Sequence, residues 1–258
     1  MKQIDMNCDM GEGFGLYELT DDNELIKYIS SANVACGFHA GDPMIMRRTV
    51  ALAKRHGVAV GAHPGFQDLM GAGRRYISAS RAEIENYLLY QIGALKAFVE
   101  AEGLELQHVK PHGAIYFYAM EDENWVRACV DAIVKVNPSL IYMVLGGTKG
   151  EMMVRIARES GLKVAREAFP DRAYLSKGTL VPRGQPGAVI LNSDEVAERA
   201  VRIATEGKVK AIDGTVIDLH ADTLCFHGDN IESVQALQKV QQGMKRAGVK
   251  VSPLGTFL

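Results

Sequence analysis

Polar side chains suited to proton transfer follow a short apolar segment near the N-terminus. The stretch NCDMGEGFG, residues 7–15, places Asn7, Asp9 and Glu12 directly after that segment. If the segment is a buried strand, an amide and two carboxylates cannot all be surface groups. Carboxylates at such a position can act as a general acid or base. The stretch therefore indicates either a sharp polar turn or the first wall of an active site.

Other apolar segments end in the same way. His39 and Asp42 stand in GFHAGD, His63 stands in GAHPGF, and Lys110 and His112 stand in VKPHGAIY. A lysine within V-K-P-H-G is poorly placed for a solvent-exposed face, and burying its charge requires a partner or a substrate. Any single histidine here can equally be a hydrogen-bonded structural residue. The recurrence along the chain favours a shared site.

The later segments continue the pattern. Arg172 follows the sixth apolar segment, after Glu167 and Asp171, and His227 and Asp229 follow the last one in CFHGD. The remaining histidines have simpler interpretations. His56 is expected at the C-terminal end of a helix, where the helix dipole favours it. His108 lies within a predicted strand and His220 before the last one, and both are expected to be structural.

Seven apolar segments alternate with helical patterns along the chain, which predicts seven β-α units with parallel strands. Capping residues support the helices, because Ser80-Arg-Ala-Glu83 has the form of a capping box and Gly57, Gly161 and Gly207 follow predicted ends. The predicted strands are 3–8, 33–38, 58–62, 106–110, 141–146, 163–168 and 222–227, and the predicted helices are 22–31, 43–56, 80–102, 121–136, 150–160, 193–205 and 231–246.

The units leave no room for a linker, so we predict one domain over residues 1–258. An open doubly wound sheet would concentrate its site at one switch point. A β/α barrel brings all strand C-termini to one rim. Polar groups after almost every strand favour the α/β fold of a seven-stranded (β/α) barrel.

Composition narrows the class of protein. The 258 residues are 47% hydrophobic with a net charge of −2, and no basic run is present, so no nucleic-acid partner is expected. No apolar run approaches the ~20 residues that span a bilayer, and no signal peptide is recognised. Four scattered cysteines predict reduced thiols, most of them small core residues, in a cytoplasmic protein; they are Cys8, Cys36, Cys129 and Cys225.

Nucleotide-binding signatures are missing from the sequence. It contains no G-x-x-x-x-G-K-[ST] motif, and the glycines of residues 11–15 lack the dinucleotide spacing. Two long connections, 64–79 and 169–192, are expected to be lids or binding loops. Their arginines, including Arg74 and Arg75, suit a carboxylate or a phosphate, or are solvated charges.

Seven short segments, in their order, carry a resemblance to a known family that runs from residue 3 to about residue 257. The segments are NCDMGEGFG, NVACGFHAGD, GAHPGF, KPHGAIY, DRAY, PGAVI and CFHGD. In these segments and their order the chain resembles the LamB/YcsF family. The resemblance implies a seven-stranded barrel similar to the glycoside hydrolase/deacetylase fold. It also implies ATP-dependent opening of the lactam of 5-oxo-L-proline (pyroglutamate) to L-glutamate, with ATP as co-substrate and with 5-oxoprolinase subunits B and C as partners.

That reaction assigns hypothetical roles to the residues. We expect Asp9 to be the general base, His63 and His112 to be acids or orienting groups, and Lys110 to stabilise developing negative charge. Asp229 would orient an imidazole. The residues expected to bind substrate are Asn7, Glu12, His39, Asp42, His227 and Arg172, the last through the substrate carboxylate.

Two alternatives stay open. At the level of the fold the chain is similar to metal-dependent deacetylases, in which case Asp9, His63 and His112 would be the ligands of a divalent metal. Met10 stands where those enzymes carry a second aspartate, which weakens this hypothesis. The second alternative is a non-catalytic subunit that holds substrate while its partners perform the chemistry.

Overall fold

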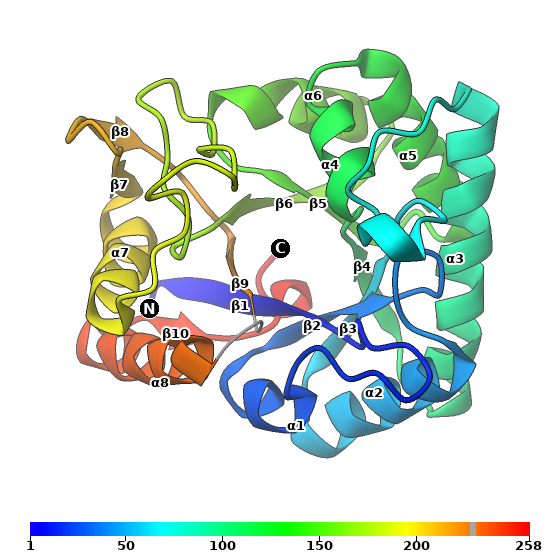
Figure 1. Cartoon of the computed structure of the whole chain (residues 1–258), viewed down its shortest axis with the longest axis horizontal. Coiled ribbons are helices and arrows are strands. Elements are labelled where there is room, and N and C mark those ends of the chain that lie inside the picture. The colour runs from blue at the N-terminus through cyan, green and yellow to red at the C-terminus, as the bar shows by residue number, and fades with distance from the viewer. Residues whose placement is uncertain (228–230) are drawn as a thin grey trace.

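A closed barrel of parallel strands forms the centre of the protein in a computed structural model that describes residues 1–227 and 231–258 (Figure 1). Each strand pairs with the next along the chain, and the last pairs with the first, so that the sheet closes. The barrel strands are β1 (Gln3–Met10), β2 (Ser31–Ala35), β3 (Ala59–His63), β4 (Leu106–Val109), β5 (Ile141–Leu145), β6 (Lys163–Ala168) and β9 (Thr223–Phe226). The predicted seven-stranded (β/α) barrel is confirmed.

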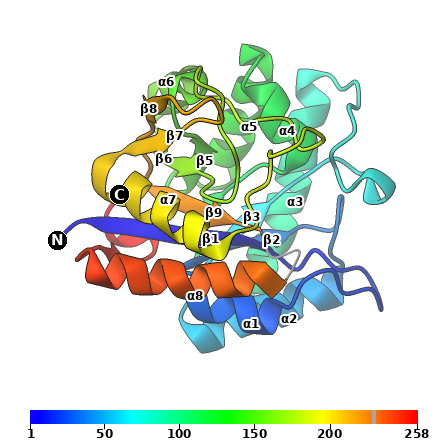
Figure 2. The ribbon, with the colours of Figure 1, turned by 60° about the vertical axis from the view of Figure 1, so that its left-hand side comes forward.

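Helices surround the barrel on its outside, and α7 and α8 lie side by side (Figures 1 and 2). The helices are α1 (Asp22–Leu25), α2 (Pro43–His56), α3 (Arg81–Ala101), α4 (Gly113–Ala119), α5 (Glu123–Val136), α6 (Glu151–Glu159), α7 (Ser193–Glu206) and α8 (Ile231–Arg246), with 3₁₀ turns η1 (Ile26–Tyr28), η2 (Leu69–Gly71), η3 (Thr148–Gly150) and η4 (Leu254–Thr256). The predicted capping box forms at the start of α3, where Ser80 and Glu83 exchange hydrogen bonds.

The strand β1 separates two environments by alternation, because successive side chains point to opposite faces. Met6, Cys8 and Met10 pack in the apolar core around the barrel. Asp5 and Asn7, also buried, belong instead to a hydrogen-bonded polar network with residues of neighbouring strands. The polar barrel interior therefore leads from Asp5 towards Asp9.

The interior polar residues satisfy one another. Asn7 Nδ2 donates to Thr223 Oγ1 at 2.7 Å, and Thr223 donates to Asp5. On the other side, Asn33 Nδ2 donates to Asn7 Oδ1 at 2.7 Å, and His108 Nε2 lies 2.8 Å from Asn33 Oδ1. Burial lowers the pKa of His108 to about 3, so its ring is neutral and donates to this oxygen.

Several predicted boundaries were wrong. The helix predicted over 22–31 ends at Leu25 and continues only as η1, because Ile29 is extended and Ser31 already pairs with Asn7 of β1. The strand predicted to reach residue 38 ends at Ala35. Gly113 begins the short helix α4, which the sequence patterns did not predict.

Three further strands were also unpredicted. The strands β7 (Lys208–Lys210) and β8 (Val216–Asp218) form an antiparallel hairpin, and β10 (Lys250–Val251) pairs with β1. None of the helices described combines the length and apolar character that crossing a membrane requires.

Candidate active site at the mouth of the barrel

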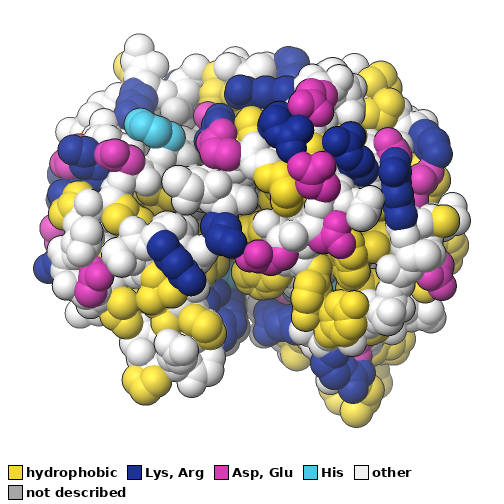
Figure 3. All heavy atoms as spheres, turned by 90° about the horizontal axis from the view of Figure 1, so that it is seen from above, with side chains coloured by type: hydrophobic (Ala, Val, Ile, Leu, Met, Phe, Trp, Pro, Cys, Tyr) yellow, Lys and Arg dark blue, Asp and Glu magenta, His cyan; other side chains and the backbone are white. Residues whose placement is uncertain are grey.

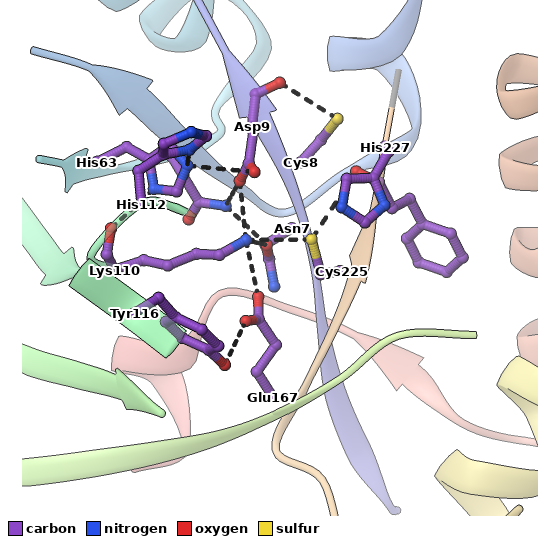
Figure 4. Close-up of polar contacts among 12 residues, drawn as sticks. Asn7, Cys8, Asp9, His63, Lys110, His112, Tyr116, Glu167, Cys225 and His227 are labelled. Atoms are coloured by element: carbon purple, nitrogen blue, oxygen red, sulfur yellow. Dashed lines mark hydrogen bonds and ion pairs between the residues drawn. The ribbon is translucent and has the colours of Figure 1, made fainter. Parts of the chain in front are cut away.

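An ion pair between the first and fourth strands lies at the centre of the site (Figure 4). Lys110 follows β4 directly, and its Nζ lies 2.8 Å from Oδ1 of Asp9, near the end of β1. Asn33 Nδ2, from β2, donates to the same oxygen at 2.8 Å. Both Lys110 and Asn33 are buried. Oδ1 of Asp9 is thus fixed by two donors, whereas Oδ2 faces His63.

A second carboxylate faces the same ammonium group. Oε1 of Glu167, in β6, lies 3.0 Å from Lys110 Nζ, and Oε2 accepts a hydrogen bond from the Tyr116 hydroxyl at 2.9 Å. The Cys225 sulfur, in β9, lies 3.1 Å from the same Nζ. Side chains from β1, β6 and β9 therefore converge on Lys110, and α4 holds one of them, Glu167, through Tyr116, as Figure 4 shows.

Electrostatics fix the charges of this pair. Burial disfavours the charged form of Asp9, but His63 and Lys110 outweigh it and hold the pKa of that carboxyl well below its usual range. Burial also opposes the Lys110 charge, but Asp9, Cys225 and Glu167 keep the pKa of the ammonium well above its usual range. Asp9 is therefore a carboxylate and Lys110 an ammonium ion.

A cluster of histidines borders Asp9 on one side. His63 Nε2 lies 3.2 Å from Asp9 Oδ2 and 2.9 Å from His112 Nδ1. The ring of His39 stacks on that of His112, with centroids 3.7 Å apart and planes 2° from parallel. Glu12 Oε1 lies 3.5 Å from His39 and 3.6 Å from His112. Burial lowers the pKa of both His39 and His112 well below the usual value.

His227 borders Asp9 on another side. Its Nδ1 lies 2.6 Å from Oδ2 of Asp171, and its ring stacks on Phe169 with centroids 5.9 Å apart. One ligand-type atom each of Asp9, Cys225 and His227 lie within 4.8 Å of one another. Asp171 thus holds the imidazole, a role predicted for Asp229, which lies outside the described residues.

Two predicted substrate-binding residues have structural partners. Asp42 is the N-cap of α2, accepting from Met44 and Ile45, and its second oxygen accepts from Gly15 N at 2.8 Å. Arg172 donates to two backbone carbonyls of its own connection, those of Val181 and Ala188. Their contact with substrate stays a prediction. The Asn7 amide, by contrast, lies within the site, with Oδ1 3.5 Å from Lys110 Nζ.

Sequence reasoning left five residues out of the predicted site: Asn33, Tyr116, Glu167, Asp171 and Cys225. Glu167 and Asp171 were recognised only as polar residues after a strand. Asn33 was the first residue of the strand predicted over 33–38, whereas in the structure it lies in the middle of β2. Tyr116 lies in the unpredicted helix α4, so no signal placed its hydroxyl in the barrel.

A cleft opens between two projecting lobes, with Lys and Arg side chains on both sides (Figure 3). Arg74 and Arg183 lie close enough to lower the pKa of Arg172, although burial is the larger cause. Arg75 pairs with Asp68 in its own connection. In GGTKG, Lys149 Nζ lies 3.0 Å from Glu121 Oε1. Arg74 and Arg183 therefore add positive charge close to Arg172.

The fold and site define a seven-stranded β/α barrel protein with a buried, charged polar centre at the C-terminal ends of its strands. The LamB/YcsF family model matches residues 4–258, and the chain belongs to the LamB/YcsF family.

Relatives and a solved structure support the assignment along the whole chain. A protein of Pyrococcus furiosus, named as the A subunit of 5-oxoprolinase, is 52% identical over 256 residues, covering 99% of both chains. Another of that name, from Natranaerobius thermophilus, is 52% identical over 257 residues, covering 100% of this chain and 99% of its own. The crystal structure of a lactam utilization protein from Thermus thermophilus superposes with a TM-score of 0.91 at 48% identity, covering 97% of this chain and 99% of that one.

Proposed function

We propose that the protein is the A subunit of an ATP-dependent 5-oxoprolinase, a hydrolase that opens the lactam of 5-oxo-L-proline to L-glutamate with partner subunits B and C. The observation that carries the proposal is the buried Asp9–Lys110–Glu167 cluster, in a chain about half identical to proteins named as the A subunit of 5-oxoprolinase. The word subunit in those names indicates an assembly.

Ring opening makes three chemical demands. The amide carbon must become a better electrophile, which ATP can achieve by phosphorylating the amide oxygen, with release of ADP and later of phosphate. Water must lose a proton as it attacks that carbon, and the ring nitrogen must gain one as the C–N bond breaks. Negative charge that develops on oxygen requires a fixed donor.

Lys110 supplies the donor for negative charge. Its ammonium has three N–H groups, and these face Asp9, Glu167 and Cys225. A thiol is a weak acceptor, so a substrate oxygen gains its donor by displacing Cys225. Glu167, held by Tyr116, keeps the ammonium in place during that exchange.

Asp9 supplies the base. Its pKa is low while Lys110 donates to it, and such a carboxylate is a weak proton acceptor. When substrate oxygen draws the ammonium towards itself, that stabilisation weakens and Asp9 becomes more basic. Substrate binding and activation of the base are thereby coupled through one side chain.

His227 supplies the proton to the ring nitrogen. Its Nδ1 is engaged by Asp171, which leaves Nε2 to act within the site. Asp171 and His227 come from the connections after β6 and β9, so this acid approaches Asp9 from the side opposite to His63, as Figure 4 shows.

The nucleotide is expected to need the partners. The sequence carries neither a P-loop nor a dinucleotide fingerprint, and Lys149 of GGTKG is paired with Glu121. We therefore propose that the isolated chain does not couple ATP to ring opening. Arg74, which lies close to Arg172, then serves the anionic substrate, or a phosphoryl group brought by a partner.

Reconstitution with each subset of subunits tests the proposal. Glutamate and ADP are measured with 5-oxo-L-proline and ATP, and the matched control omits ATP. We expect ATP-coupled glutamate only when this chain and both partners are present. Full activity of subunits B and C without this chain would contradict the proposed function. Robust turnover by this chain alone would contradict the division of labour.

A further inference from the structure

We propose that Glu12, His63 and His112 form a binding site for one divalent transition-metal ion, with His39 as the residue that positions them. This ligand set replaces Asp9 of the predicted set with Glu12. The proposal stands apart from the proposed function, because it concerns binding of an ion rather than the reaction.

Hydrogen bonds to the backbone fix the orientation of two of these rings. His63 Nδ1 lies 2.7 Å from the carbonyl oxygen of Lys110, and His112 Nε2 lies 2.8 Å from that of Ala72. A carbonyl oxygen only accepts, so both of these ring nitrogens carry their proton and donate. In neutral rings the other two nitrogens, His63 Nε2 and His112 Nδ1, are therefore bare lone pairs.

Those two lone pairs face each other. His63 Nε2 and His112 Nδ1 are 2.9 Å apart, and Asp9 Oδ2, a further acceptor, lies 3.2 Å from the former. Acceptors at these distances repel unless a proton or a cation lies between them. The outward hydrogen bonds are those that metal-binding imidazoles make to fix their tautomer.

Glu12 completes the group. Its Oε1 is buried and has no hydrogen-bond partner among the described residues, and the same holds for both ring nitrogens of His39, which is 2% exposed. Ligand-type atoms of Glu12, His39, His63 and His112 all lie within 4.8 Å of one another. The distance from Glu12 Oε1 to His112 Nδ1 is 3.6 Å. Ligands held at ~2.0–2.1 Å in a tetrahedron are about 3.3 Å apart, which lies between this distance and the 2.9 Å from His63 Nε2 to His112 Nδ1.

Ring geometry decides between the two stacked histidines. The rings of His39 and His112 are parallel to within 2° and stacked with centroids 3.7 Å apart. Their lone pairs therefore lie in two separate parallel planes, and one ion cannot lie in both planes. His112 is the ligand, because its Nδ1 faces His63 Nε2. His39 stacks on that ring and lies 3.5 Å from Glu12 Oε1, and so positions both.

Charge balance favours a dication here. Three carboxylates lie in this part of the barrel, those of Asp9, Glu12 and Glu167, against the single ammonium of Lys110, which pairs with Asp9 and Glu167 and not with Glu12. Two imidazoles and one carboxylate suit zinc and its neighbours in the first transition series rather than magnesium or calcium. Such an ion, when bound, supplies a Lewis acid or lowers the pKa of a bound water.

Asp9 is excluded as a ligand by its other partners. Its Oδ1 accepts hydrogen bonds from Lys110 and Asn33. A cation bound at Oδ2 would be repelled by the nearby Lys110 ammonium. The group of ligand-type atoms that all lie within 4.8 Å of one another consists of Glu12, His39, His63 and His112, without Asp9.

Metal binding to the purified full-length chain tests the proposal. After treatment with a chelator, the chain is titrated with Zn²⁺ against a chromophoric competitor, and with Co²⁺ to record its visible absorption bands. We expect one ion per chain and Co²⁺ bands of a four-coordinate site. Glu12→Gln and His112→Asn should each weaken Zn²⁺ binding at least ~10-fold. His56→Gln, on the exposed end of α2, should leave binding unchanged. Asp9→Asn removes one nearby negative charge and no ligand, so it should weaken binding less than Glu12→Gln does.

Three results would overturn the proposal. The first is no stoichiometric ion in the wild-type chain, which would leave a shared proton between His63 and His112. The second is binding that survives both Glu12→Gln and His112→Asn. The third is binding lost in Asp9→Asn but kept in Glu12→Gln. The thermal stability of each variant is measured in the presence of chelator, to show that the variant is folded. Glu12→Gln is the variant expected to disturb folding least, because the Glu12 side chain is partly exposed. Because no assay uses ATP or 5-oxo-L-proline, failure here leaves the proposed function untouched.

Discussion

The Tyr116 hydroxyl donates to Oε2 of Glu167 at 2.9 Å, and Oε1 of the same carboxylate lies 3.0 Å from Lys110 Nζ. Burial and Glu167 together raise the pKa of Tyr116 well above its usual value, so the phenol remains a donor. The carboxylate is thus held by α4 on one side and serves Lys110 on the other.

Replacement of Tyr116 by Phe tests this relationship. We expect the free energy of unfolding to fall by ~1.5–3 kcal/mol, the worth of a hydrogen bond to a charged group. Activity of the reconstituted complex should fall as well, because Glu167 no longer holds the ammonium. Chemical denaturation and turnover are measured together, and Tyr90→Phe, at an exposed ring, is the control. Unchanged stability would show that the hydroxyl contributes nothing to the cluster.

Asp9→Asn should preserve the fold, since the two side chains have nearly the same shape and Lys110 retains Glu167 as a partner. Turnover should fall by ~10²–10⁴, as is typical when a general base is lost. The matched control is Asp131→Asn, which removes an exposed ion pair with Arg81. If the reconstituted rate is unchanged in Asp9→Asn, Asp9 has no part in proton transfer.

Gly61→Ala should destabilise the protein through His108. A Cβ at residue 61 would lie 1.9 Å from His108 Nε2, so the ring must move away from Asn33. A cost of ~1–3 kcal/mol is expected for such overpacking. In a His108→Ala background the same change should cost much less, which a double-mutant cycle measures. Additive costs would mean that the two residues do not meet.

Asp5 should make stability depend on pH. Burial raises the pKa of its carboxyl to about 6 from 3.8, although Ser31, Thr223 and Ser30 oppose the shift by hydrogen bonds. The folded state therefore binds this proton more tightly than the unfolded state. The contribution is fully present below about pH 4, is lost as the pH rises through about 6, and is worth at most ~3 kcal/mol.

Denaturation of wild type and Asp5→Asn between pH 4 and 7 isolates this effect. The difference in unfolding free energy between the two proteins should change across that window, with the wild type losing stability relative to the variant as the pH rises. The common titrations of other groups cancel in the difference. A difference independent of pH would contradict the raised pKa of Asp5.

The barrel could be predicted because its signals are local. Apolar segments, the capping box at Ser80 and the glycine after α2 each act within a few residues, and the structure has strands and helices close to the predicted places. The predicted boundaries were wrong where contacts between residues far apart in the sequence determine which element a residue joins. Ser31 belongs to β2 because it pairs with β1 and donates to Asp5, which no local pattern reports.

The site divides in the same way. A polar residue after an apolar segment predicted that Asp9, His63, Lys110 and His112 would meet, and the structure brings their side chains together. The hydrogen-bond partner of each side chain could not be predicted. Asp171, for example, contacts His227 from a connection whose sequence has no periodic pattern. The roles of these residues in the reaction stay predictions.

Closure of the sheet by β1 and β9 has a consequence for how the chain acquires its structure. Met6 pairs with Leu224, and the buried Asn7 and Asp5 find Thr223 more than 200 positions away. Contacts of such long range are slow to form, and on a ribosome Thr223 emerges after most of the chain. Until then the polar groups of β1 lack these partners. We expect nascent chains that end before β9 to remain sensitive to protease, and acquisition of resistance to coincide with synthesis of the last strand.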